Sequence, residues 1–167
     1  MEIHSITSFL NYYERVRERT NKLVKIIPPH QLDWSYMPGK FSIGDLIRHI
    51  SSIERNMFAE TIAGRQSKYA GCGKNLADGY ENVLAYFNQM HEETLIIIGG
   101  LTEEDLQRRC LTPGNASLPV WKWLRALTEH EIHHRGQLYL YLNMVGINAP
   151  PMFGLTAEQV QAFSEKK

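Results

Sequence analysis

Two histidines, His130 and His134, stand four residues apart in the polar run 128–137. If this run is helical, the two side chains lie about 40° apart around the axis and one turn apart along it. Two imidazoles in this arrangement can both reach one ion at the Zn–N distance of roughly 2.0–2.1 Å. A third nitrogen must then come from elsewhere in the chain, and His49 is the best candidate.

Helical periodicity indicates which histidines face the core. His130 and His134 fall on the apolar side of their helix, which is set by Val120, Leu124, Leu127, Leu138 and Val145. His49 falls on the core side of an earlier segment, together with Leu46, Ile50, Ile53 and Met57. Burying three imidazoles without partners would cost several kcal/mol, and a shared metal ion removes that cost. His4, His30 and His91 have no partner at ligand spacing, and we interpret these three as surface or packing residues. His133 lies at the edge of the apolar face or outside it, and we expect it to meet solvent or another helix.

Three neutral ligands leave at least one coordination position open, which is typical of a catalytic zinc site. The ion would lower the pKa of a bound water towards about 7 and would equally stabilise a thiolate. The sequence thus allows two reactions, hydrolysis and thiol transfer. Glu131, next to His130, is a candidate general base. The simpler interpretation of Glu131 is a contact that orients a ligand, or a salt bridge with Arg135 one turn later.

Two other functions compete with a small-molecule enzyme. The run from His130 to His134 matches H-E-x-x-H, the zinc-protease signature in which Glu131 would be the base. Glu158 lies downstream, where a third ligand could be sought. However, strands that could hold an extended peptide are not predicted, and the metzincin continuation fails after Gly136. The second alternative is a metal-binding, stress-related protein without turnover, which a fourth protein ligand would favour.

The elements that must position these residues are helices. Helical periodicity predicts four long helices and one short C-terminal helix, over residues 3–27, 42–63, 78–98, 119–145 and 157–164. Ser42 and Asp45 predict a capping box, and residues 102–105 are expected to begin one short extra helix. Four helices of this length pack naturally as a four-helix bundle. The sequence therefore predicts one all-α domain spanning residues 1–167.

The connections between these helices are less regular. The Gly-rich stretch 65–78 is long for a helix connection, and we interpret it as a functional or mobile loop. It could cover the end of the bundle and receive an anionic thiol through Lys68, Tyr69 and Lys74. Residues 113–115, Pro-Gly-Asn, are typical of a turn.

Composition limits the classes of partner. Lys plus Arg and Asp plus Glu both number 18, so the formal net charge is zero, unlike that of strongly basic nucleic-acid-binding domains. The chain has neither an apolar run of roughly 20 residues nor the basic and apolar pattern of a signal peptide. Its two cysteines do not form a disulfide framework. We expect a cytoplasmic protein that binds neither nucleic acid nor membranes.

Two motifs carry a resemblance to a known family. Residues 38–50 (PGKFSIGDLIRHI) resemble the second-helix entry of the DinB-like superfamily, and residues 130–137 (HEIHHRGQ) resemble its last-helix motif. With the similar tail 146–156, the resemblance extends over nearly the whole chain.

The resemblance implies a four-helix bundle with one crossover connection, commonly a homodimer. It also implies a divalent ion, nickel or zinc, on His49, His130 and His134. Because the superfamily includes bacillithiol-type S-transferases, we expect a thiol S-transferase or a hydrolase that acts on a small-molecule substrate. A low-molecular-weight thiol would be the co-substrate of the transfer.

Overall fold

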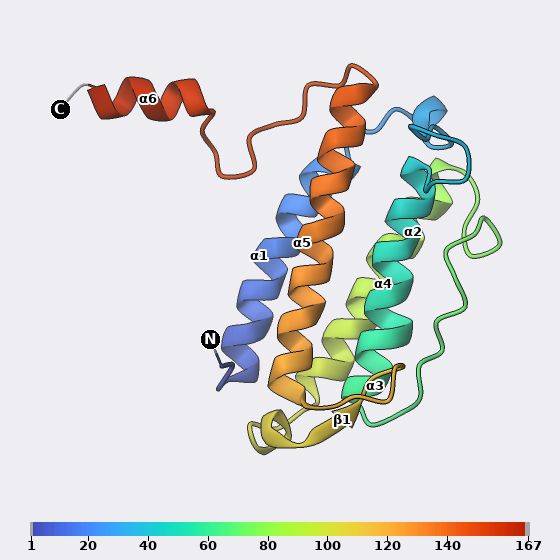
Figure 1. Ribbon diagram of the computed structural model, residues 1–167, viewed down its shortest axis with the longest axis vertical. Coiled ribbons are helices and arrows are strands. Elements are labelled where there is room, and N and C mark those ends of the chain that lie inside the picture. The colour runs from blue at the N-terminus through green and yellow to red at the C-terminus, as the bar shows by residue number, and fades with distance from the viewer. Residues whose placement is uncertain (1, 166–167) are drawn as a thin grey trace.

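The computed structural model describes residues 2–165, and its four long helices form a bundle (Figure 1). These helices are α1 (Ile6–Val24), α2 (Ile43–Ile53), α4 (Tyr80–Gly99) and α5 (Val120–Met144). One π-helical turn, Glu54–Ala59, and the short α3, Glu60–Ile62, continue α2 without a break. The predicted all-α class and four-helix bundle are confirmed, with helix ends within a few residues of those expected.

The bundle has an unusual order of neighbours. Both α1 and α2 pack against α4 and α5, so that α1 and α2 lie on a diagonal. Figure 1 shows α1 and α5 running in one direction and α2 and α4 in the other. Because α2 and α4 are parallel, the chain must return along the full bundle between them. Residues 63–79, here called the crossover segment, make this return beside α2 and form the predicted crossover connection (Figure 1).

The crossover segment is held against α2 and does not cover the bundle end, which corrects our expectation for the Gly-rich stretch. Arg48, fully buried on α2, donates hydrogen bonds to the carbonyls of Cys72 at 2.8 Å and Ala77 at 3.0 Å. Lys74, which we expected to contact an anionic thiol, instead pairs with Asp33 at 2.7 Å. These contacts give the segment a fixed path despite its glycines.

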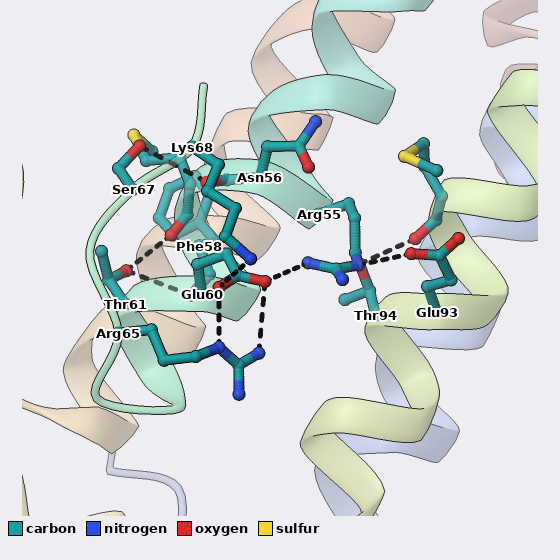
Figure 2. A network of polar contacts seen from close by, with 12 residues as sticks. Arg55, Asn56, Phe58, Glu60, Thr61, Arg65, Ser67, Lys68, Glu93 and Thr94 are labelled. Atoms are coloured by element: carbon teal, nitrogen blue, oxygen red, sulfur yellow. Dashed lines mark hydrogen bonds and ion pairs between the residues drawn. The ribbon is translucent and has the colours of Figure 1, made fainter. Parts of the chain in front are cut away.

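A buried carboxylate anchors the start of the crossover segment (Figure 2). Glu60 on α3 is 1% exposed and pairs with Arg55 at 2.5 Å, Arg65 at 2.7 Å and Lys68 at 3.3 Å. Arg55 also reaches Glu93 on α4 at 2.7 Å. The hydrogen bond from Arg65 is the largest cause that lowers the pKa of Glu60 to about 2. The network therefore links α3, α4 and the crossover segment. Lys68, the other lysine expected to contact an anionic thiol, is part of this network.

Local signals at the helix ends are confirmed. The side chain of Ser42 accepts from the amide of Asp45 at 3.0 Å, and the Asp45 carboxylate accepts from the amide of Ser42 at 3.0 Å. These two bonds form the predicted capping box of α2. The short helix expected after residue 102 is a 3₁₀ turn, Glu104–Gln107. The last long helix, predicted from residue 119, begins one residue later at Val120, and Pro119 is its N-cap.

One element of the structure was not predicted, and one predicted helix lies away from the bundle. Strands β1 (Arg109–Leu111) and β2 (Ser117–Pro119) form a short antiparallel hairpin around the expected turn, and the sequence did not indicate them. The C-terminal helix α6 (Ala157–Glu165) forms as predicted but projects away from the bundle (Figure 1). In the described part of the chain, no helix is both long enough and apolar enough to cross a membrane.

Candidate metal centre

Three predicted histidines meet between α2 and α5. One ligand nitrogen from each of His49, His130 and His134 lies within 4.8 Å of the other two. The Nε2 atoms of His49 and His130 are 3.2 Å apart, and the ring centroid of His134 lies 4.6 Å from that of His49. Nitrogens bound to one ion at about 2.0–2.1 Å lie at most about 4.2 Å apart. Small side-chain adjustments, of less than about 1 Å, would thus bring all three to a common ion.

Hydrogen bonds on the outer ring nitrogens orient two of these imidazoles. The amide oxygen of Gln137 lies 2.7 Å from Nδ1 of His134, and an oxygen there requires a proton on Nδ1. The hydroxyl of Tyr69, from the crossover segment, lies 2.9 Å from Nδ1 of His49. Both contacts leave Nε2 as the nitrogen available to an ion, as is usual for metal-binding histidines. Gln137 could be found from its helical spacing to His134. Tyr69, which we expected to contact an anionic thiol, instead contacts His49, and the sequence did not indicate that contact.

The histidines are held in their neutral forms. Burial, assisted by His134, lowers the pKa of His49 to about 4. Burial, assisted by His134 and His49, lowers the pKa of His130 to about 3. Burial also lowers the pKa of His134. Neutral imidazoles have free lone pairs, and a cation between facing nitrogens would remove their mutual repulsion. The donor set therefore fits a divalent ion, and imidazole alone does not select among zinc, nickel, copper and iron.

The cluster has no fourth ligand in the described part of the chain, and one of its members, His134, borders a cavity. Among residues 2–165, no fourth His, Cys, Asp or Glu joins the three histidines. His133, the neighbour on the same helix, is exposed and contacts Gln137. The cavity has a volume of about 240 Å³ and is lined by Tyr36, Gly39, Lys40, Phe41, His134, Gln137 and Tyr141. The site can accept a small ligand beside the histidines.

Glu131 does not face the histidines. Its side chain is 1% exposed and points towards α1, where it accepts a 2.7 Å hydrogen bond from Thr20 and lies 3.2 Å from Arg17. Arg135 donates to the carbonyl of Val16 at 3.1 Å instead of forming the expected salt bridge with Glu131. Because 100° of helical rotation separates Glu131 from His130, the carboxylate belongs to another face of α5. These contacts give no support to Glu131 as a general base or to the protease pattern, and Glu158 lies on the exposed helix α6.

A second polar cluster, built around Arg17, was not indicated by the sequence. The ring nitrogens of His91 lie 2.6 Å from Glu54 and 2.9 Å from Glu14, and Glu54 also pairs with Arg17. His91, which we expected to be a surface or packing residue, is therefore a buried member of an ion network. Its partners come from α1 and the π-helical turn, so no local spacing links them.

Comparison with known proteins agrees with this architecture. The sequence profile of the DinB superfamily matches residues 12–138. The uncharacterized protein YjoA of Bacillus subtilis (strain 168) is 32% identical over 154 residues, which cover 89% of this chain and 93% of that relative.

Solved structures show the same fold at lower identity. A DinB-like protein from Bacillus cereus ATCC 10987 matches with a TM-score of 0.72 and 18% identity, covering 89% of this chain and 97% of that one. YfiT from Bacillus subtilis, described as a probable metal-dependent hydrolase with an unusual four-helix bundle topology, matches with a TM-score of 0.68 and 16% identity, covering 89% and 91% of the two chains. From the sequence match and the shared fold, we conclude that this chain belongs to the DinB superfamily.

Proposed function

We propose that this protein is a divalent-metal-dependent enzyme that acts on a small molecule, and that its reaction is hydrolysis. The observation that carries the proposal is the convergence of His49, His130 and His134 beside a cavity, with no fourth ligand among residues 2–165. An open side is typical of catalytic zinc sites, whereas structural sites are closed. Hydrolysis is preferred to thiol transfer because the similar fold of YfiT is described as a probable metal-dependent hydrolase. Zinc and nickel are the proposed ions.

A bound ion would supply Lewis-acid activation of a water or thiol nucleophile. The chain's own residues prepare the site for that chemistry. Burial keeps the three histidines neutral, and Gln137 and Tyr69 fix the rings of His134 and His49. Tyr141, 7% exposed, forms an apolar wall of the cavity. In this proposal these residues hold the ligands, and the cavity walls orient the substrate and limit the access of water.

The proposed assembly is a homodimer. Ile132, Leu140 and Met144 recur at multiples of four residues along α5 and are 38%, 53% and 54% exposed. An apolar stripe on the outside of a bundle helix is the kind of surface that a second copy covers. Light scattering coupled to size exclusion tests this, and a monomer at micromolar concentration, with Leu140→Glu unchanged in mass, would contradict the dimer.

Metal analysis of untagged protein tests the site. We expect about one zinc or nickel ion per chain in the wild type and a loss of most bound metal in His134→Ala, because removing one of three ligands destroys the chelate. His133→Ala is the matched control, since His133 is adjacent but exposed and lies outside the cluster. Equal metal content in both variants would contradict the proposed site.

Activity is then measured on the metal-loaded protein. Hydrolysis of a small activated ester should be lost in His134→Ala and retained in His133→Ala. Conjugation of a low-molecular-weight thiol to a generic electrophile, with no ester hydrolysis, would favour thiol transfer instead. Full metal occupancy with neither activity would favour the non-catalytic, metal-binding alternative.

A further inference from the structure

The cavity beside the histidines has mainly aromatic walls. The rings of Tyr36 and Tyr141 have centroids 5.7 Å apart, and Phe41 lies 5.0 Å from the ring of His49. Tyr36 and Phe41 belong to the segment that precedes α2, whereas Tyr141 belongs to α5. Side chains distant in sequence therefore form aromatic walls of one cavity that His134 borders.

Two of these aromatic rings remain partly in water. Tyr36 is 47% exposed and Phe41 is 37% exposed, although both line a concave site. Covering such rings with an apolar or aromatic ligand would remove that apolar surface from water and is favourable by about 25 cal/mol per Å². The cavity, about 240 Å³, is smaller than the roughly 300–1,000 Å³ of pockets for drug-sized ligands. Its size and walls fit a molecule with a single ring.

The charged side chain that lines this cavity, apart from the histidines, is Lys40. Within residues 2–165, Lys40 has no carboxylate at salt-bridge distance, and two acids near it in sequence are engaged elsewhere. Asp33 pairs with Lys74 at 2.7 Å, and Asp45 pairs with Arg48 at 2.6 Å. An ammonium without an acidic partner, beside a site free of carboxylates, favours an anionic ligand.

The backbone presents Lys40 by a defined turn. The amide of Lys40 donates to the carbonyl of Met37 at 3.2 Å, and Gly39 between them has a φ of 77°. This left-handed conformation is readily adopted by glycine, so the turn is encoded locally. The same carbonyl of Met37 accepts from the hydroxyl of Ser35 at 3.1 Å. Lys40 and Phe41 thus stand on a braced turn at the mouth of the cavity.

We infer that the substrate is a small aromatic monoanion, such as a benzoate that carries a hydrolysable ester substituent, whose ring lies among Tyr36, Phe41 and Tyr141 and whose charge pairs with Lys40. The inference rests on the proposed function only for the reaction itself. Recognition of the ring and of the charge uses side chains that are present without an ion.

Fragment binding to metal-free protein tests this recognition. The probes are benzoate and its neutral isostere benzamide, titrated into EDTA-treated, dialysed protein and followed by protein NMR. We expect millimolar binding and a preference for benzoate of about three- to fivefold, the size of an exposed charge pair. Lys40→Gln should abolish the preference, whereas Lys122→Gln, an exposed lysine outside the cavity, should retain it. Tyr36→Ala should weaken both probes.

Two results would overturn the inference. One is equal binding of benzoate and benzamide by the metal-free wild type. The other is a preference that appears only after zinc is added and survives in Lys40→Gln, since the ion would then hold the anion. The metal content of His134→Ala tests the proposed function separately, so that failure of the metal site and failure of ligand recognition are distinguishable.

Discussion

Replacement of Glu131 by Gln separates a structural role of this residue from a catalytic one. The Glu131 carboxylate is buried on α5 and contacts Thr20 at 2.7 Å and Arg17 at 3.2 Å. Arg17 is 2% exposed and also pairs with Glu54. We therefore expect Glu131→Gln to lower the free energy of unfolding and to leave metal binding unchanged.

The expected loss is about 2 kcal/mol. Gln keeps the shape of the side chain and an oxygen that can accept from Thr20. The charge-assisted contact with Arg17 is lost, and such a contact contributes about 1.5–3 kcal/mol. Arg17 retains Glu54, so the 3–5 kcal/mol typical of an uncompensated buried charge does not apply to this variant. Glu131→Ala should approach that larger range, because it also removes the acceptor that lies 2.7 Å from the Thr20 hydroxyl and opens a cavity.

Urea unfolding of the metal-free proteins measures the loss. Glu129→Gln is the matched control, because Glu129 lies on the same helix but is exposed and, among residues 2–165, pairs only with Arg125, at 3.2 Å. Surface pairs of this kind contribute less than about 1 kcal/mol. Zinc titration should give the same affinity for the wild type and both variants.

The reasoning would be refuted by the opposite combination of results. If Glu131→Gln unfolds like Glu129→Gln but loses about 10²-fold or more of the metal-dependent activity, Glu131 acts as a general base. In that case its side chain would have to leave Arg17 and reach the ion during the reaction.

Two further predictions concern pH and the crossover segment. Burial lowers the pKa of His49 to about 4 and that of His130 to about 3, both well below the unfolded value of about 6.5. Because the unfolded chain then binds more protons between these values, the unfolding free energy of the metal-free protein should fall as the pH drops from about 6.5 towards 4. The same fall in a His49→Phe, His130→Phe variant would contradict this. Arg48→Met should leave the carbonyls of Cys72 and Ala77 without their donor and lower the unfolding free energy by about 3 kcal/mol. Amide hydrogen exchange across residues 68–77 should become faster, and exchange rates equal to those of the wild type would show that other contacts hold the segment.

The parts of the fold that depend on local chemistry were predictable. Apolar periodicity places α1, α2, α4 and α5, because a helix in a bundle must bury one face regardless of its neighbours. The capping box of Ser42 and Asp45 follows from groups three residues apart. The hairpin of β1 and β2 was missed because three-residue strands are too short to display alternation.

Contacts between distant segments were beyond the sequence. Tyr69 reaches His49 only because α2 and α4 are parallel and the chain returns beside α2. The cluster of Arg17, Glu54 and His91 joins groups 37 and more residues apart in sequence, and no periodic pattern connects them. Glu131 was expected to orient a ligand or to pair with Arg135, whereas the packing of α5 against α1 makes it a buried partner of Arg17.

By itself, the sequence determined that His130 and His134 share one face of a helix, because the helical repeat places every fourth side chain on nearly the same side. It also determined that His49 faces the core of its own helix. Only the tertiary structure decided that these faces meet, since that depends on the side-by-side packing of α2 and α5. The tertiary structure also decided that His134 borders a cavity lined by Lys40 and by aromatic rings from the segment before α2 and from α5.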